Sequence, residues 1–215
     1  MQFLDALEAV LVGVPLTLLV MAASLAIGAV LGVPLVLGLR SRNVAVRAGC
    51  RYLVNLLRGI PAIVWLFIIY FGVSIGAYQF ASVPAAILGL GLISAAYLAE
   101  IYRGGISAVH HGQWEAGHAL GVSNWTTFSR IVGPQALRVS IPSMASYAIS
   151  LLKDSSIAST IGVTEIVFYT TQNARSGGGG LTVYILAAVM YVVLSIPLGL
   201  LSRKLDASLR KKVSR

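Results

Sequence analysis

Residues 115–136 read EAGHALGVSNWTTFSRIVGPQA, and this polar stretch decides how the rest of the chain is arranged. It is too polar to lie in a lipid bilayer, yet long apolar segments flank it on both sides. Gly121 can adopt the left-handed conformation on which a helix ends, and Ser123 or Asn124 can cap a following helix. The pattern predicts two short helices joined at Gly121, the second of which ends at Pro134.

The second of these helices has an apolar face. Its large apolar residues are spaced three and four apart: Trp125, Phe128, Ile131 and Val132. Such spacing makes a stripe along one face of a helix that a partner can cover. A polar segment that carries an amphipathic helix between membrane spans predicts a surface gripped by another protein. The alternative is an ordinary linker between spans.

The composition predicts an integral membrane protein. Of 215 residues, 57% are hydrophobic and 11% are charged, whereas soluble domains carry about 25% charged residues. The mean hydropathy is +0.86. A net charge of +9 would suit a nucleic-acid partner, but the basic residues stand at the ends of apolar runs, so no nucleic acid is expected. The single Cys50 excludes an internal disulfide and a cysteine metal cluster.

Five apolar segments are long enough to cross a bilayer, which predicts an all-α membrane protein with one transmembrane domain over residues 1–215. The expected spans cover about 10–39, 60–78, 84–103, 139–157 and 181–202. Residues 43–58 form an amphipathic basic pattern, which predicts an interfacial helix that lies flat at the headgroups, with a plain basic loop as the alternative. The fourth span is expected to break near Asp154–Ser156, because small and charged residues follow each other there.

The distribution of positive charge orients these spans. Fourteen of the 16 Lys and Arg residues fall in three segments, 40–58, 103–138 and 203–215, and only Lys153 and Arg175 fall elsewhere. Because cytoplasmic loops are enriched in Lys and Arg, we expect the N-terminus outside and the C-terminus in the cytoplasm. The polar segment at 112–136 would then also lie in the cytoplasm.

Motifs for catalysis are missing from the sequence. There is no G-x-x-x-x-G-K-[ST] phosphate loop, so we do not expect this chain to hydrolyse ATP. No H-E-x-x-H or G-x-S-x-G pattern occurs either. His110, His111 and His118 lack a carboxylate pattern that would make them a metal site, and ordinary polar histidines are expected. The chain is therefore not expected to be an enzyme or to hold a metal.

Polar side chains at membrane depth are candidates for a solute pathway. Four of them follow each other in the fourth span: Lys153, Asp154, Ser155 and Ser156. Glu100 lies deep in the third span. Charged groups inside a membrane are costly and usually face a cavity or one another. The alternatives are that Lys153 and Asp154 neutralise each other at a helix end, and that Glu100 pairs with Arg103.

The polar stretch resembles a known family motif. Glu115-Ala116-Gly117, then Gly121, Ile131 and Pro134, is similar to the EAA loop of the membrane subunits of binding-protein-dependent ABC importers, whose pattern is E-A-A, three residues, G, nine residues, I-x-L-P. Gly117 departs from the second alanine of that pattern, and Gly133 departs from its leucine. A glycine at position 117 is expected to loosen the first helix by about 1 kcal/mol relative to alanine.

Three further segments resemble the polar amino-acid uptake permeases of the histidine, glutamine and arginine type. They are LRGIP at 57–61, AYLAEIYRGGI at 96–106 and LLKDSSIAS at 151–159. The resemblance covers nearly the whole chain in order. It implies a permease subunit of an ATP-driven importer in the bacterial cytoplasmic (inner) membrane, with five transmembrane helices and a cytoplasmic EAA-type coupling loop at 112–136.

The resemblance also implies partners. Two cytoplasmic ATPase subunits would grip the loop, a second permease chain, identical or homologous, would complete the pathway, and an extracytoplasmic solute-binding protein would deliver a small polar amino acid. The chain would bind no cofactor itself, because ATP and Mg would be bound by the ATPase subunits. Membrane lipid would surround the spans.

The resemblance assigns roles to two sets of residues. The set expected to couple to the ATPase comprises Glu115, Ala116, Gly117, Leu120, Gly121, Trp125, Phe128, Ile131 and Pro134. The set expected to line the substrate pathway comprises Glu100, Lys153, Asp154, Ser155 and Ser156.

Two other functions use the same loop. An ATP-independent channel would move solute without an ATPase partner, and a membrane scaffold would dock partners through the loop without moving solute. The identity of the amino acid and the choice between a homodimer and a heterodimer of permeases stay open.

Overall fold

The computed structural model describes residues 2–75, 78–177 and 180–213, and its regular structure is almost wholly helical. The elements in chain order are α1 (Gln2–Leu39), α2 (Val44–Gly59), α3 (Ala62–Phe67), the π-helical turn η1 (Ile68–Gly72), the short strands β1 (Ser74–Ile75) and β2 (Tyr78–Gln79), α4 (Ser82–Ala108), α5 (Gly112–Ala119), α6 (Asn124–Thr127), the π-helical turn η2 (Phe128–Val132), α7 (Gly133–Asp154), the 3-10 helix η3 (Ser155–Ile161), α8 (Ile166–Arg175) and α9 (Leu181–Val213). The two strands form an antiparallel pair in which Ser74 lies opposite Gln79 and Ile75 opposite Tyr78.

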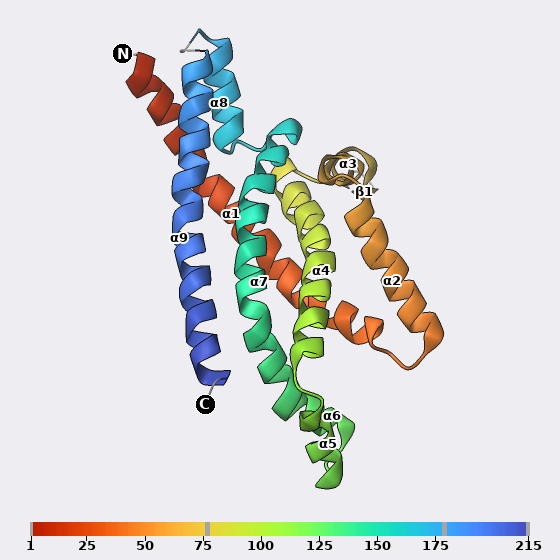
Figure 1. Cartoon of the computed structure of the whole chain (residues 1–215). Coiled ribbons are helices and arrows are strands. Elements are labelled where there is room, and N and C mark those ends of the chain that lie inside the picture. The colour runs from red at the N-terminus through yellow and green to blue at the C-terminus, as the bar shows by residue number, and fades with distance from the viewer. Residues whose placement is uncertain (1, 76–77, 178–179, 214–215) are drawn as a thin grey trace.

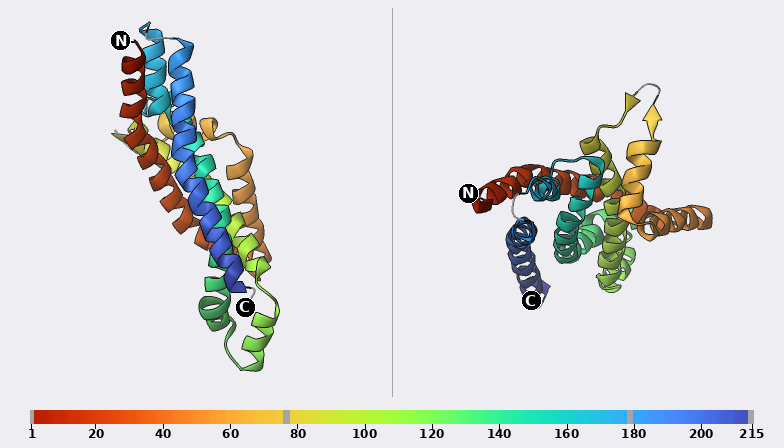
Figure 2. Two further views of the ribbon diagram at one scale, coloured as in Figure 1. Left: turned by 60° about the vertical axis from the view of Figure 1, so that its left-hand side comes forward. Right: turned by 90° about the horizontal axis from the view of Figure 1, so that it is seen from above.

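Four long helices, α1, α4, α7 and α9, run along the length of the molecule (Figure 1). The helices α5 and α6 project from one end of this bundle, and the N-terminus lies at the other end. The C-terminus lies toward the end that carries α5 and α6. The two further views show α8 beside the first turns of α1 and α9 (Figure 2). The bundle therefore has one end formed by α8 and the helix starts, and one end formed by α5 and α6.

Small residues let α1 and α4 pack closely. A side chain at Gly28 would overlap Ser94, and one at Gly91 would come within 2.9 Å of Ile27. Ala95 and Ala99 of α4 are also buried in this contact region. Helices in a membrane gain little from the hydrophobic effect between them, so close van der Waals contact of small residues is what holds them together. The helix α4 is thereby the most enclosed of the long helices.

Buried hydroxyl groups join helices at the N-terminal end of the bundle. The Thr17 hydroxyl donates to the carbonyl oxygen of Gly13 at 3.0 Å and accepts from the backbone N–H of Ile166 at 3.2 Å. The Ser24 hydroxyl donates to the carbonyl oxygen of Ile87 at 3.2 Å. Each bond satisfies a polar group that would be costly to leave unpaired in an apolar interior. The bond from the Ile166 N–H to Thr17 also fixes the start of α8 against α1.

Three helices among the described residues are long and apolar enough to cross a membrane: Phe3–Leu39, Ser82–Ala108 and Leu181–Lys204. A bent pair, Val44–Gly59 with Ala62–Gly72, can be counted as a fourth span. The prediction of an all-helical membrane protein is confirmed at this level. The helix α7, which lies over most of the predicted span 139–157, has 22 residues but does not reach the same apolar composition.

The region of the second predicted span differs from the prediction. A single helix was expected over 60–78, after a separate flat helix over 43–58. The observed helix covers only Ala62–Gly72 including the π-helical turn, about 16 Å of rise, and the strand pair follows. It joins α2 at an angle of 100°, because Pro61 has no N–H with which to continue α2. The helix α2 packs against α1 and α4, so the two segments together form one bent unit.

The fourth predicted span changes its geometry near the expected place. The α-helix ends at Asp154 and tightens into η3, which ends at Ile161. Gly162 then adopts a left-handed conformation with φ of +86°, which a residue with a Cβ rarely tolerates. The helix α8 then runs to Arg175.

We expect Gly105→Ala to destabilise the bundle where α4 crosses α7. The new methyl group would meet the side chain of Ser140 and, at 2.6 Å, the carbonyl oxygen of Ala136. Overpacking of this kind typically costs about 1–3 kcal/mol. The thermal midpoint of the protein purified in a mild detergent measures the effect.

Gly104→Ala is the matched control, because Gly104 is the neighbouring residue in α4 and a methyl group there meets nothing within 4 Å. Alanine also favours a helix over glycine, so the midpoint of this variant should not fall. Equal midpoints for the two variants would contradict the close crossing of α4 and α7.

Candidate functional site

The first helix of the candidate loop, α5, packs on the second, α6, through Gly117. A side chain at Gly117 would overlap the buried side chain of Thr127, with its Cβ 2.5 Å from the threonine Oγ1. The glycine was expected to loosen this helix. Instead, it lets α5 and α6 pack closely as one unit, which alanine at this position would prevent. Glu115, on the exposed side of α5, pairs with His111 at 3.0 Å.

The turn between the two helices has the geometry that its sequence predicts. Gly121 has a φ of +68°, and the backbone N–H of Val122 donates to the carbonyl oxygen of Gly117 at 2.9 Å. The Ser123 hydroxyl accepts from the backbone N–H of Thr126 at 3.2 Å and caps α6. The predicted hinge residue and the predicted cap are both confirmed.

Pro134 does not end the second helix, so that prediction was wrong. The helix runs from α6 through the π-helical turn η2 into α7, and Pro134 stands in the first turn of α7. Proline lacks the N–H that a continuous α-helix needs at that position. A π-helical turn directly before the proline shifts the hydrogen-bond register, so the chain absorbs the missing donor without breaking. The loop is thereby joined to α7 by continuous helix.

The predicted apolar stripe is divided between the protein's own core and its surface. Val132 is fully buried, and Phe128 and Ile131 are half-buried. Trp125 is 66% exposed and Leu120 is 79% exposed. The Phe128 ring lies 6.3 Å from the Trp114 ring and 6.0 Å from the Trp125 ring, measured between centroids. Two large apolar side chains are thus left uncovered on a loop whose other aromatic rings pack together.

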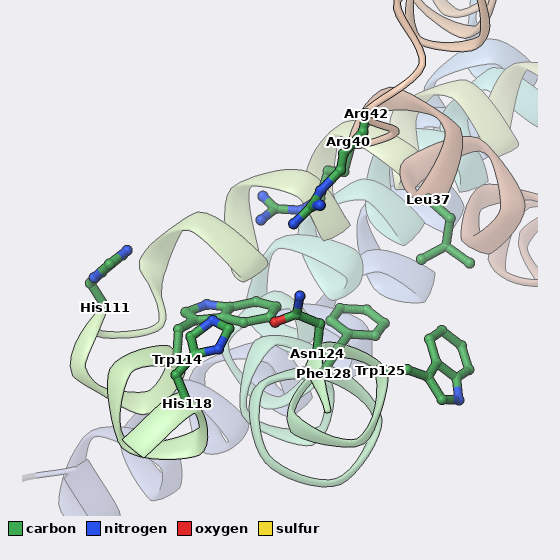
Figure 3. A pocket seen from close by; sticks show the side chains of 9 residues that line it. All are labelled: Leu37, Arg40, Arg42, His111, Trp114, His118, Asn124, Trp125 and Phe128. Atoms are coloured by element: carbon green, nitrogen blue, oxygen red, sulfur yellow. The ribbon is translucent and has the colours of Figure 1, made fainter. Parts of the chain in front are cut away.

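A cavity of about 580 Å³ lies between this loop and the end of α1 (Figure 3). Its lining residues are Leu37, Arg40, Arg42, His111, Trp114, His118, Asn124, Trp125 and Phe128. The sequence indicated the two arginines only as markers of orientation and the histidines only as ordinary polar residues. No local pattern could have revealed the cavity, because α1 and the loop are far apart in the chain.

The predicted pathway residues at the end of α7 divide into exposed charges and internally bonded hydroxyl groups. Lys153 and Asp154 are exposed, and within the part of the chain that the structure describes they form no ion pair with each other. Ser155 is buried and donates to the carbonyl oxygen of Leu152 at 2.7 Å. Ser156 donates to the carbonyl oxygen of Lys153 at 2.7 Å. The two charges are therefore the groups still free to meet a solute.

Lys153 lines a second cavity, of about 550 Å³, between α7 and α9. Tyr191, Ser195 and Arg203 line the same cavity. Glu100 lies elsewhere, on α4, and is held by Arg103, whose guanidinium donates to its carboxylate at 2.6 and 2.8 Å. The structure thus places Lys153 at a cavity between α7 and α9, apart from Glu100, which has a partner of its own.

Glu165 is a buried carboxylate that the sequence analysis missed. It is 1% exposed, it accepts from the backbone N–H of Phe168 at 2.9 Å as the cap of α8, and it accepts from the Tyr191 hydroxyl at 2.8 Å. The sequence signal that could have revealed this buried group is a carboxylate within the apolar run between η3 and α8. Its partner on α9 could not be read from the sequence. Among the described residues, no group of three His, Cys, Asp or Glu is placed to hold a metal ion.

Comparison with known proteins covers most of the chain. Residues 24–211 match the family described as the binding-protein-dependent transport system inner membrane component. The probable amino-acid ABC transporter permease protein YckA of Bacillus subtilis is 39% identical over 186 residues, which is 85% of this chain and 80% of that protein. The arginine ABC transporter permease protein ArtQ of Haemophilus influenzae is 36% identical over 71% of this chain and 72% of its own length.

A solved structure confirms the fold. A crystal structure of an amino acid ABC transporter with histidines contains a chain that matches with a TM-score of 0.85 and 27% identity, over 95% of this chain and 94% of that chain. The fold described above is therefore shared with a chain of that amino acid ABC transporter. The chain belongs to the family of inner membrane components of binding-protein-dependent transport systems, the non-catalytic permease subunits of ABC importers.

Proposed function

We propose that this permease subunit forms part of the translocation pathway for a small polar amino acid and is driven by cytoplasmic ATPase subunits through the loop at 112–136. Residues 1–215 act as one transmembrane domain. The relatives are described as amino-acid and arginine permeases, which supports the class of solute. The observation that carries the proposal is the compact α5–α6 unit, which projects from one end of the bundle with Trp125 and Leu120 uncovered.

The proposed topology has five spans with the N-terminus outside and the C-terminus in the cytoplasm. The spans are α1, the bent pair α2–α3, α4, α7 with η3, and α9. The N-terminus lies at the end of the bundle opposite α5 and α6, as this topology requires (Figure 1). Arg40 and Arg42 line a cavity with the loop residues. Basic residues at the same end as the loop support a cytoplasmic location for that end.

The loop can transmit a movement of the ATPase to the spans because its helices are rigidly connected to one another and to α7. The helix α4 leads into it and α7 leaves it through continuous helix, while Gly117 and Thr127 lock α5 to α6. Closure of two ATPase subunits around ATP and Mg would move this rigid unit and, through it, α4 and α7. Exposed aromatic residues dominate the energetics of protein interfaces, and Trp125 with Leu120 is the pair available for the ATPase. The other predicted coupling residues would maintain the structure of the α5–α6 unit.

Lys153 and Asp154 are the proposed contacts of the solute. A zwitterionic amino acid carries one group of each charge, and these neighbouring side chains offer the complementary pair without being paired to each other. Glu100, Ser155 and Ser156 belong to the proposed lining, with Glu100 acting beside Arg103. A second permease chain and a solute-binding protein would complete the pathway, and this chain would bind no cofactor itself.

Transport should depend on ATP. We expect the permease reconstituted with its ATPase and solute-binding protein to take up a labelled polar amino acid only when ATP and Mg are supplied. The reason is that this chain has no phosphate loop with which to supply energy itself. Uptake that persists without ATP would instead support the ATP-independent channel, and stable ATPase docking without any uptake would support the scaffold.

We expect Trp125→Ala to weaken the binding of the ATPase by about 2 kcal/mol, or roughly thirtyfold, since buried tryptophans are frequent hot spots of interfaces. The dissociation constant between the purified permease and its ATPase measures the effect. Tyr52→Ala is the matched control, because Tyr52 is a similarly exposed aromatic residue (71%) on α2, away from the loop. Equal affinities of the two variants for the ATPase would rule out Trp125 as an anchor.

We expect Lys153→Met and Asp154→Asn each to raise the KM for uptake about tenfold or more, because a charge-assisted contact is worth roughly 1.5–3 kcal/mol. Uptake of a panel of labelled polar amino acids gives the measurement. Lys204→Met removes an exposed lysine of α9 outside the cavity and should leave the KM unchanged. Glu100→Gln should have a smaller effect than Asp154→Asn. If both α7 variants keep the original KM and specificity, the assignment of the pathway fails.

A further inference from the structure

The cavity between α1 and the coupling loop is basic. Two of its lining residues, Trp125 and Phe128, belong to the proposed ATPase-coupling set, but its arginines have no role in the proposed transport mechanism. Arg40 and Arg42 lie on one side of it, and the side chains of Trp114, His118 and Asn124 lie on the other (Figure 3). No carboxylate is among its lining residues. A volume of about 580 Å³ lies within the range of sites for small molecules. The cavity is thus suited to an anionic group.

No carboxylate among the described residues neutralises the two arginines. Neither forms an ion pair with any carboxylate in the described part of the chain. Their backbone is nevertheless held in place. Arg47 donates to the carbonyl oxygen of Ser41 at 3.0 Å, and Asn43 caps α2 by accepting from the backbone N–H of Ala45 at 2.9 Å. The segment that connects α1 to α2 therefore presents two uncompensated guanidinium groups on a backbone that is held in place, and such groups suit the oxygens of a phosphate group.

An apolar groove of about 320 Å³ adjoins the basic cavity, and the two share Leu37 and Phe128 as lining residues. The groove lies between α1, α4 and α7. Its two hydroxyl groups are already used: Tyr102 donates to the carbonyl oxygen of Ala29 at 3.2 Å, and Ser140 donates to that of Ala136 at 2.9 Å. The groove therefore offers an occupant apolar contact only.

The apolar groove also opens to the outside of the bundle. Val33, Leu37 and Leu137 line it and are 47%, 39% and 51% exposed. A basic cavity at the end of a membrane helix, joined to an apolar groove that continues along the helix, matches the two parts of a phospholipid. The arginines would bind the phosphate, and the groove would hold an acyl chain. Along α1, the arginines lie nearer the end of the helix than the groove does, as the phosphate and the acyl chain of one lipid require.

We propose that this composite site binds one anionic phospholipid of the cytoplasmic leaflet, with the phosphate between Arg40, Arg42 and the loop and one acyl chain in the groove. The assignment of the leaflet rests on the proposed function, because it takes the loop to be cytoplasmic. Basic pockets between transmembrane helices on that side are suited to anionic headgroups. The bound lipid would connect the end of α1 to Trp114 and His118, which lie on the helix that the ATPase is proposed to move.

The test uses the intact importer, extracted in mild detergent with its own ATPase subunits and examined by native mass spectrometry. Equal amounts of phosphatidylglycerol and phosphatidylethanolamine are added, and the mass of the adduct identifies what is bound. We expect retention of phosphatidylglycerol by the original protein, and about tenfold weaker retention when Arg40→Gln and Arg42→Gln are combined. An adduct with the mass of free phosphate would overturn the lipid assignment.

The matched control combines Arg51→Gln with Arg138→Gln, which removes two exposed arginines that do not line the cavity. This control should retain phosphatidylglycerol like the original protein. Equal loss in both double variants would show that only net charge matters and would overturn the site, as would equal retention of the two lipids by the original protein. An acidic side chain of the ATPase is the rival occupant. It would show itself as loss of the ATPase, not of lipid, from the Arg40 and Arg42 double variant.

The same spectra separate this inference from the proposed function. If the ATPase subunits accompany the permease but no arginine-dependent lipid is seen, the lipid site fails and the importer stands. If an arginine-dependent lipid is seen on a chain that never carries an ATPase, the importer fails and the lipid site stands.

Discussion

The close crossing of α4 and α7 is the contact on which the loop at 112–136 depends. Gly105 brings α4 against Ser140, whose hydroxyl group donates to the carbonyl oxygen of Ala136 and also approaches that of Ile101 at 3.4 Å. These two helices carry the two ends of the loop. Because they are held together just before the chain leaves the bundle, α5 and α6 have a fixed base. A wider crossing would let the loop move without the spans.

Within the loop, rigidity comes from a close contact between helices, a helix cap and a π-helical turn. Gly117 lets α5 touch Thr127, Ser123 caps α6, and the π-helical turn η2 carries the helix past Pro134 without a break. Only Gly121 adopts a left-handed conformation between the two helices. A motif that departs from its family pattern at position 117 thus gains a tighter contact where the departure alone would indicate a weaker helix.

The parts of this fold that lipid dictates could be predicted from the sequence, and the parts that depend on distant partners could not. Long apolar runs indicated α1, α4 and α9, since a backbone in hydrocarbon has to satisfy its own hydrogen bonds. Local chemistry indicated Gly121 and the cap at Ser123. Pro61 indicated the end of α2, but the 100° angle at which the next helix leaves it and the passage of the helix through Pro134 could not be read from local sequence. The basic cavity and the Glu165–Tyr191 bond each join segments that are remote in the chain.

The bonds around Glu165 also determine which parts of the bundle can separate. Glu165 holds Tyr191 of α9, and the next residue, Ile166, is held by Thr17 of α1. The starts of α1, α8 and α9 are thereby fastened into one block, while α7 continues into this block through η3 and Gly162 and also packs against α9. An opening on that side of the protein would therefore have to form while the starts of α1, α8 and α9 stay together, with the movement taken up by the remaining helices.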